Sequence, residues 1–226
     1  MSTANAGSEV LVEREDGVRI VRLFDYEASL AYRAAFAGVY QTVFNEPPYN
    51  ERFYPSEAQS VLRMHLETPE QIVLLAVRGV SQVVGFGLAL PVVARADVTR
   101  ELRGLLPIRH TMYMSELGVL RRYRKSGLGS QLVQLRLSLI HASRFEHVVL
   151  RTSASRDAAY DMFMQLGFED MGAYMEVKSR RVDGKVSTDR RLFLTRSAIP
   201  EGQVSSDDPN AFDEDTGDAA TWAPEI

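Results

Sequence analysis

The chain has 226 residues, of which 45% are hydrophobic and 25% are charged, and it contains no cysteine. This composition predicts one globular domain with a sizeable core, and it excludes a disulfide-bonded scaffold, a thiol nucleophile and a thiolate metal site. The formal net charge of -4 is unevenly distributed along the sequence. The eight charged side chains after Arg196 are all acidic, which leaves residues 1–196 with a net charge of +4.

The charge distribution and the composition of the two termini predict the limits of the domain and the cellular location of the protein. We expect a flexible N-terminus over residues 1–8, a folded domain over 9–196 and an acidic, disordered tail over 197–226, with a lid or partner contact by Trp222 as the alternative. A net charge of +4 favours an anionic ligand but is too low for a nucleic-acid partner. No stretch resembles a signal peptide or approaches the ~20 apolar residues that cross a bilayer, so we expect a cytoplasmic protein without a membrane partner.

The first half of the domain predicts a hairpin, two helices and a second hairpin. Alternating apolar and polar residues around Asp16-Gly17 indicate the first hairpin, and Pro47 and Pro48 stop the first helix. Gly79 joins the strands of the second hairpin. The predicted elements are strands over 10–14 and 18–24, helices over 26–44 and 56–67, strands over 71–78 and 81–93, and a polar link over 95–103.

A strand over 111–119 then leads through a basic, glycine-bearing turn into an amphipathic helix. At such a turn the first helical N–H groups have no intrahelical acceptor and lie at the positive end of the helix dipole, which suits phosphate oxygens. Gly127 and Gly129 lack a Cβ and let a diphosphate approach the backbone. The candidate contacts are Leu120, Arg121, Arg124, Lys125, Ser126, Gly127, Leu128, Gly129 and Ser130. A solvated helix start is the alternative interpretation.

The spacing of the glycines narrows the choice of phosphate ligand. A Walker loop needs a lysine directly after its second glycine, and a dinucleotide fingerprint needs a third glycine or alanine where Leu132 stands. What remains is Arg-x-x-Gly-x-Gly, filled by Arg124, Gly127 and Gly129 after Val119 at the end of the strand. This pattern resembles the acyl-CoA-binding motif of the GNAT superfamily of N-acetyltransferases.

The downstream sequence extends the resemblance. A strand over 147–152, a helix over 155–166 and strands over 172–181 and 186–194 follow in the order of the GNAT fold. The helix is similar to the family pattern Ala-x-x-Leu-Tyr-x-Lys-x-Gly-Phe at Ala159, Met162, Phe163, Gln165, Gly167 and Phe168. Over residues 18–196, the resemblance and the predicted elements imply a single α/β (α+β) domain, with helices on both faces of a mixed, mostly antiparallel sheet of about six to seven strands.

The resemblance implies an enzyme that moves the acetyl group of acetyl-CoA to a primary amine in a ternary complex, without a metal. The backbone at Gly118 and Val119 would bind the pantetheine arm and the acyl carbonyl, although a plain strand glycine explains Gly118 equally well. Glu116, on the same strand, is the candidate base for the amine, with a solvent-facing structural role as the alternative. By the same resemblance Phe163 would contact the cofactor, but it replaces the tyrosine that often protonates the CoA thiolate, and Tyr160, one helical turn earlier, is the candidate for the missing phenol.

The acceptor is a small-molecule or peptide amine whose identity the motifs do not give. The loop over 45–54 (NEPPYNERFY) gathers carboxylates and aromatic rings where the superfamily often walls its acceptor site, or it simply joins two helices. Homodimers are common in the superfamily, so a homodimer stays open. Because Phe163 replaces the usual tyrosine, the alternative function is a catalytically silent acyl-CoA-binding sensor or interaction domain. A nucleotide-binding protein fits the loop spacing less well.

Overall fold

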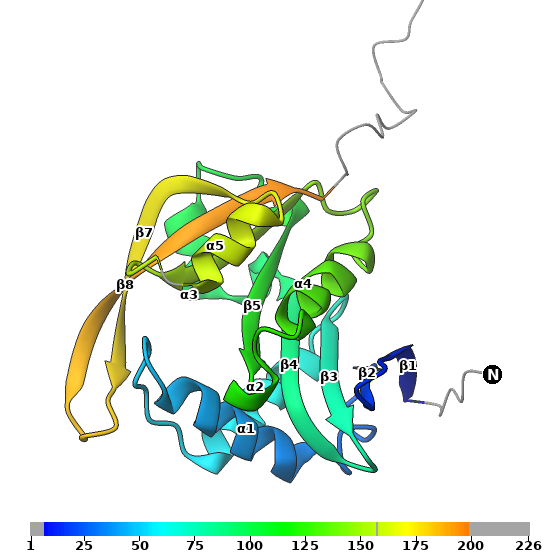
Figure 1. Ribbon diagram of the computed structural model, residues 1–226. Coiled ribbons are helices and arrows are strands. Elements are labelled where there is room, and N and C mark those ends of the chain that lie inside the picture. Colours follow the sequence, from blue (N-terminus) through cyan, green and yellow to red (C-terminus); the bar gives the residue numbers. More distant parts are fainter. Residues whose placement is uncertain (1–6, 157, 199–226) are drawn as a thin grey trace, which may run out of the picture.

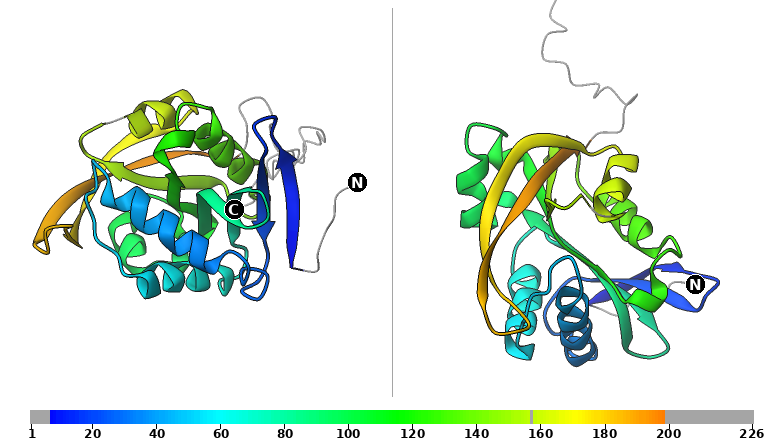
Figure 2. Two further views of the ribbon diagram at one scale, coloured as in Figure 1. Left: turned by 60° about the horizontal axis from the view of Figure 1, so that its bottom comes forward. Right: turned by 60° about the vertical axis from the view of Figure 1, so that its left-hand side comes forward.

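The computed structural model describes residues 7–156 and 158–198, which form an eight-stranded sheet with helices on both faces (Figures 1 and 2). The strand order is β1-β2-β3-β4-β5-β6-β8-β7, and every neighbouring pair is antiparallel except β5 and β6. The elements are β1 (Ser8–Glu13), β2 (Val18–Leu23), α1 (Arg33–Asn45), α2 (Pro55–Leu66), β3 (Ile72–Arg78), β4 (Gln82–Pro91), α3 (Ala96–Leu102), β5 (Thr111–Val119), α4 (Leu128–Ser138), β6 (His147–Ser153), α5 (Ala158–Gln165), β7 (Glu169–Arg180) and β8 (Val186–Ser197), with short 3-10 turns at Val92–Ala94, Ile108–His110 and Arg121–Tyr123.

The predicted fold class is confirmed, and the sheet has one strand more than the upper predicted number. Successive strand residues alternate between the two faces, so Leu74 belongs to the core under α4 and α5, while Val73 and Leu75 belong to the core under α1 and α2. Figure 2 shows these two helix layers on opposite sides of the central strands. A third core of Leu90, Tyr113 and Phe193 lies beneath α3.

Two element predictions need correction. The helix predicted over 26–44 begins at Arg33, because residues 26–32 form turns in which Ser29 Oγ donates to the carbonyl of Tyr26 at 2.6 Å. The polar link over 95–103 contains α3, whose buried Val98 and Leu102 have helical spacing hidden among charged neighbours. The predictions for residues 1–8 and 197–226 fall largely outside the described residues.

The sheet opens between its two parallel strands. β5 pairs with β6 from Thr111↔His147 to Met114↔Leu150 and no further. On its other edge β5 stays paired with β4 to Val119, and one extra residue in β5 makes a bulge between the pairs Leu90↔Tyr113 and Leu88↔Glu116. Within the described residues, the second half of β5 therefore has no strand partner on the β6 side, and a gap opens there.

Gly118 is a glycine because an aromatic ring occupies the space of its side chain. A Cβ at Gly118 would lie 2.4 Å from Cζ of Phe86, whose ring packs on Phe36 and Tyr40. We expect Gly118→Ala to lower the free energy of unfolding by about 1–3 kcal/mol, as overpacked cores do. Denaturant unfolding of the variant measures this loss.

A matched control is Gly38→Ala in α1, where a Cβ meets nothing within 4 Å. This exposed helical change is expected to leave stability unchanged or to raise it by up to about 1 kcal/mol. Adding Phe86→Leu to Gly118→Ala should recover part of the loss. Equal stability of Gly118→Ala and the native chain would contradict the packing explanation.

Candidate active site

The turn between β5 and α4 presents a run of backbone amides without partners. Gln131 N–H makes the first helical hydrogen bond of α4, to the carbonyl of Gly127, and within the described residues the amides of 125–130 have no acceptor. Lys125 and Gly127 have φ angles of 61° and 80°, the left-handed conformation that aims successive N–H groups to one side. The predicted anion cradle is therefore compatible with the backbone geometry.

Arg124 and Arg14 hold this turn in place. Arg124 Nε donates to the carbonyl of Val119 at 2.9 Å, and its Nη2 lies 2.7 Å from the carboxylate of Glu46 after α1. Arg14, in the β1–β2 turn, donates to the carbonyl of Ser126 at 2.9 Å. Arg124 is thus a brace in this conformation, whereas the exposed Arg121 and Lys125 have no acidic partner among the described residues.

A cavity of about 530 Å³ lies at the gap between β5 and β6. Its walls come from both faces of the sheet, because they include side chains of the core under α1 and α2 and of the core under α4 and α5. The apolar wall residues include Tyr40, Phe44, Phe53, Val61, Met64, Met114, Leu117, Leu150, Ala159, Phe163 and Val177. The cavity therefore runs through the sheet at the place where the strands separate.

Glu116 projects into this cavity from the splayed half of β5. Tyr40 Oη in α1 donates to Glu116 Oε2 at 3.3 Å. Burial raises the pKa of Glu116 to about 7, against the opposing effect of Arg95 and Arg151, and Glu51 adds to the rise. A carboxylate with a pKa near neutrality accepts a proton better than an exposed one, so this position suits a group that has to take up a proton at neutral pH.

Arg136 is a buried guanidinium that sequence reasoning missed. Its exposed fraction is 1%, and its Nη1 donates to the carbonyls of Leu88 at 2.9 Å and Glu116 at 3.1 Å, which fixes the bulge. Gly87 makes room for it, since a Cβ there would lie 2.9 Å from its Nε. Burial lowers the pKa of Arg136 to about 9, so it stays charged at neutral pH. Its spacing of four and eight residues from the buried Leu132 and Leu128 was the available signal.

His65 supports the same bulge from α2. Its Nδ1 lies 2.7 Å from the carbonyl of Val61, so it carries the proton, and Nε2 accepts from Ser115 Oγ at 2.6 Å. Burial lowers the pKa of His65 to about 4, which keeps the ring neutral at physiological pH. The pair positions Ser115 in the cavity wall, and nothing in its sequence spacing indicated this contact.

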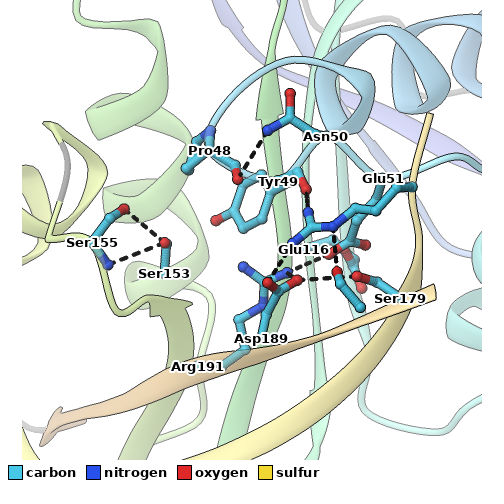
Figure 3. A network of polar contacts seen from close by, with 12 residues as sticks. Pro48, Tyr49, Asn50, Glu51, Glu116, Ser153, Ser155, Ser179, Asp189 and Arg191 are labelled. Carbon is cyan, nitrogen blue, oxygen red and sulfur yellow. Dashed lines mark hydrogen bonds and ion pairs between the residues drawn. The ribbon is translucent and has the colours of Figure 1, made fainter. Parts of the chain in front are cut away.

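The loop over 45–54 forms one wall of the cavity, through Tyr49, Glu51, Arg52 and Phe53. Figure 3 shows the polar network that joins this loop to the β7–β8 hairpin beside Glu116. Arg191 forms an ion pair with Glu51, and Arg181 contacts the carbonyl of Tyr49 and the carboxylate of Asp189. Burial raises the pKa of Glu51, opposed by Arg191. The hairpin partners were not among the sequence candidates.

The two aromatic candidates on α5 lie differently. Phe163 is buried in the cavity wall and meets Phe168 edge-on at 5.7 Å between ring centroids. Tyr160 is not part of the wall, and its phenol donates to Asp170 Oδ2 at 3.4 Å, beside the ion pair of Asp170 with Arg156. In this arrangement the Tyr160 phenol contacts Asp170 and does not line the cavity that contains Glu116.

None of the helices in residues 7–156 and 158–198 is long and apolar enough to cross a membrane. The same residues contain no group of three or more histidine and acidic side chains arranged to hold a metal ion.

Comparisons with known proteins relate this fold to one family. The sequence model described as the acetyltransferase (GNAT) family matches residues 36–168. Among solved structures, an N-acetyltransferase from Staphylococcus aureus has 14% identity and a TM-score of 0.55, covering 80% of this chain and 99% of that chain. A ribosomal-protein-alanine N-acetyltransferase from Brucella melitensis has 17% identity and a TM-score of 0.54, covering 78% of this chain and 98% of that chain. YncA of Salmonella typhimurium, solved with its cofactor acetyl-CoA, has 14% identity and a TM-score of 0.56, covering 83% of this chain and 98% of that chain. No curated protein sequence matches significantly.

Proposed function

This chain belongs to the GNAT family of acetyltransferases, and we propose that it moves an acetyl group from acetyl-CoA to a primary amine by direct attack in a ternary complex. The observation that carries the proposal is the position of Glu116. Its carboxyl lies in a cavity that passes through the sheet, three residues before the end of the strand that leads into the cradle. The base and the acyl-donor site thus belong to one element.

The residues of the cradle fit the diphosphate of coenzyme A. Within the part of the chain that the structure describes, the six successive amides of 125–130 have no acceptor, and Gly127 and Gly129 leave the backbone open. Arg121 and Lys125 add exposed positive charge. The pantetheine arm and the acyl group would occupy the gap beside β5, with Phe163 and Leu117 as apolar wall. Acetyl-CoA supplies the activated acetyl group, and the protein supplies position, apolar surface and a base.

Glu116 would take the proton of the attacking amine. As the new bond forms between the amine nitrogen and the acetyl carbon, the bond from that carbon to sulfur breaks. The amine proton goes to the Glu116 carboxylate, and the leaving thiolate takes a proton from water. We assign no side chain as acid, because Phe163 has no proton to give and the Tyr160 phenol contacts Asp170.

Phe163 also motivates the second candidate function, a silent domain that binds acyl-CoA as a sensor or interaction module. Both candidates predict saturable binding of CoA. They differ in turnover, because the silent domain releases no CoA from acetyl-CoA at any amine concentration.

The test is CoA release from acetyl-CoA with a panel of primary amines, alongside calorimetric binding of CoA. A thiol-reactive dye reports the released CoA directly, because the chain has no cysteine to react with it. When both substrates are varied, double-reciprocal plots of the initial rate should give intersecting lines, as expected for a ternary complex. Parallel lines would contradict direct attack. Binding without turnover for every amine would support the silent domain instead.

A further inference from the structure

Three exposed cationic residues border the cavity on its hairpin side: Arg52 in the loop after α1, and Lys178 and Arg180 on β7. Arg52 N–H donates to the carbonyl of Arg180 at 2.7 Å, so the two segments run side by side. Both guanidinium groups lie near the ring of Tyr54, at 5.5 Å for Arg52 and 5.0 Å for Arg180. Lys178 precedes Arg180 by two residues and therefore extends from the same face of the strand. We call these three residues the cationic wall.

The cationic wall has more charge than its neighbours neutralise. Arg180 forms an ion pair with Glu57, with Nη1 3.4 Å from Oε1, but neither Arg52 nor Lys178 has an acidic partner among the described residues. Among the other basic residues of the lining, Arg95 and Arg151 share Asp97, Arg191 holds Glu51, and Arg136 is buried against the carbonyls of Leu88 and Glu116. In total the lining includes seven basic side chains and three acidic ones. Among the described residues of the lining, the exposed charge without an acidic partner is thus at Arg52 and Lys178.

Resting on the proposed function, we propose that the acceptor is a small amine that also carries an anionic group, a carboxylate or a phosphate, bound by Arg52 and Lys178 while its amine reaches Glu116. An amine with no anion arrives as a cation and is repelled by the cavity's net positive charge. An amine that carries an anion has no net positive charge, and its anionic end is attracted to the wall. The wall thereby selects the acceptor and orients its amine toward the base.

The test uses matched acceptor pairs that differ in the anion. ω-Amino acids of increasing chain length are compared with their ω-amino amides, and O-phosphoethanolamine is compared with ethanolamine, so that the two arms separate carboxylate from phosphate. Rates are expressed per concentration of neutral amine, because the amines differ in pKa. We expect kcat/KM to favour the anionic member of at least one pair by about 10-fold or more, with the preference shrinking as salt is added.

Variants of the wall connect that preference to its residues. Arg52→Met and Lys178→Met are each expected to raise KM for the anionic acceptor by about 10-fold, with kcat and the KM for acetyl-CoA unchanged. The matched control is Lys185→Met, an exposed lysine in the turn of the same hairpin that pairs with Asp183 and does not line the cavity. This control should retain the native KM.

The outcomes separate the inference from the proposed function. If the neutral amides are acetylated as well as the acids, or peptide N-termini are used regardless of charge, the proposed preference for anionic acceptors is wrong. The proposed acetyltransferase function still stands in that case. If acetyl-CoA binds and no amine of either kind is acetylated, the proposed function fails and the inference with it. If anionic acceptors are preferred but Arg52→Met and Lys178→Met both keep the native KM, the wall is not their binding site.

Discussion

Glu116→Gln is expected to lower kcat/KM for the amine by about 10²- to 10⁴-fold, the range measured for loss of a general base. Glutamine keeps the volume of the side chain and can still accept from the Tyr40 hydroxyl, but it cannot take a proton. CoA binding, measured by calorimetry, should stay within twofold of the native value, because the cradle is built from other residues. A variant with native kcat/KM would exclude Glu116 as the base.

The pH dependence gives a second readout of the same variant. The base must be ionised, so the ratio of native to Glu116→Gln rates should rise tenfold per pH unit below neutrality and level off near the pKa of about 7. Taking the ratio with one acceptor cancels the titration of the amine itself. A ratio that does not change with pH would contradict the assignment.

The same raised pKa has a consequence for stability. The folded chain keeps the Glu116 proton between its unfolded pKa of 4.5 and its folded pKa of about 7, so the carboxyl disfavours folding increasingly as pH rises through that window. Glutamine removes the effect. The gain in unfolding free energy of Glu116→Gln over the native chain should therefore grow by roughly 3 kcal/mol from pH 4.5 to pH 8. His65 contributes equally to both proteins, and its own titration cancels.

Gly129→Asp is expected to weaken CoA binding by at least about 100-fold, or roughly 2.7 kcal/mol. The new carboxylate would stand among the unpartnered amides and repel a diphosphate. The helix should tolerate the change, because an acidic residue in the first turn of a helix is favourable. A Cβ at Gly129 meets the sulfur of Met162 at 3.5 Å, an ordinary contact.

Gly129→Asn is the matched control, with nearly the same shape and no charge. It is expected to retain measurable CoA binding, and both variants should keep the native unfolding midpoint within about 1 kcal/mol. Equal CoA affinity of Gly129→Asp and the native chain, measured by calorimetry, would place the diphosphate elsewhere.

The sequence was sufficient for the fold and for the strand-to-helix turn, because these depend on local signals. Thr111–Val119 was predicted at the bounds observed for β5, and Gly127 has the left-handed φ angle that its residue type indicates. The helix before the proline pair was predicted to end at Phe44, and α1 ends one residue later, at Asn45. The family assignment followed from the spacing of Arg124, Gly127 and Gly129, and the family match confirms it.

The cavity wall was less predictable because it depends on contacts between distant segments. Arg191 reaches Glu51 across 140 positions of sequence, and Arg136 reaches the carbonyl of Leu88 across 48. Neither arginine belongs to a motif, so no spacing rule could bring it to Glu116. The role of Gly118 depended in the same way on Phe86, a ring on the neighbouring strand. The sequence did place Arg136 on the apolar stripe of α4. A charged side chain in an apolar stripe is a local inconsistency of the kind expected at functional sites.

The passage of the cavity between β5 and β6 has a consequence for inhibitor design on the proposed function. The acyl donor and the acceptor would then be two separate molecules that approach from opposite sides of the sheet. A conjugate that joins coenzyme A covalently to an acceptor has to thread one end through the opening before the other end docks. Such a conjugate should associate slowly and dissociate slowly, whereas its two halves, offered separately, should bind and leave fast.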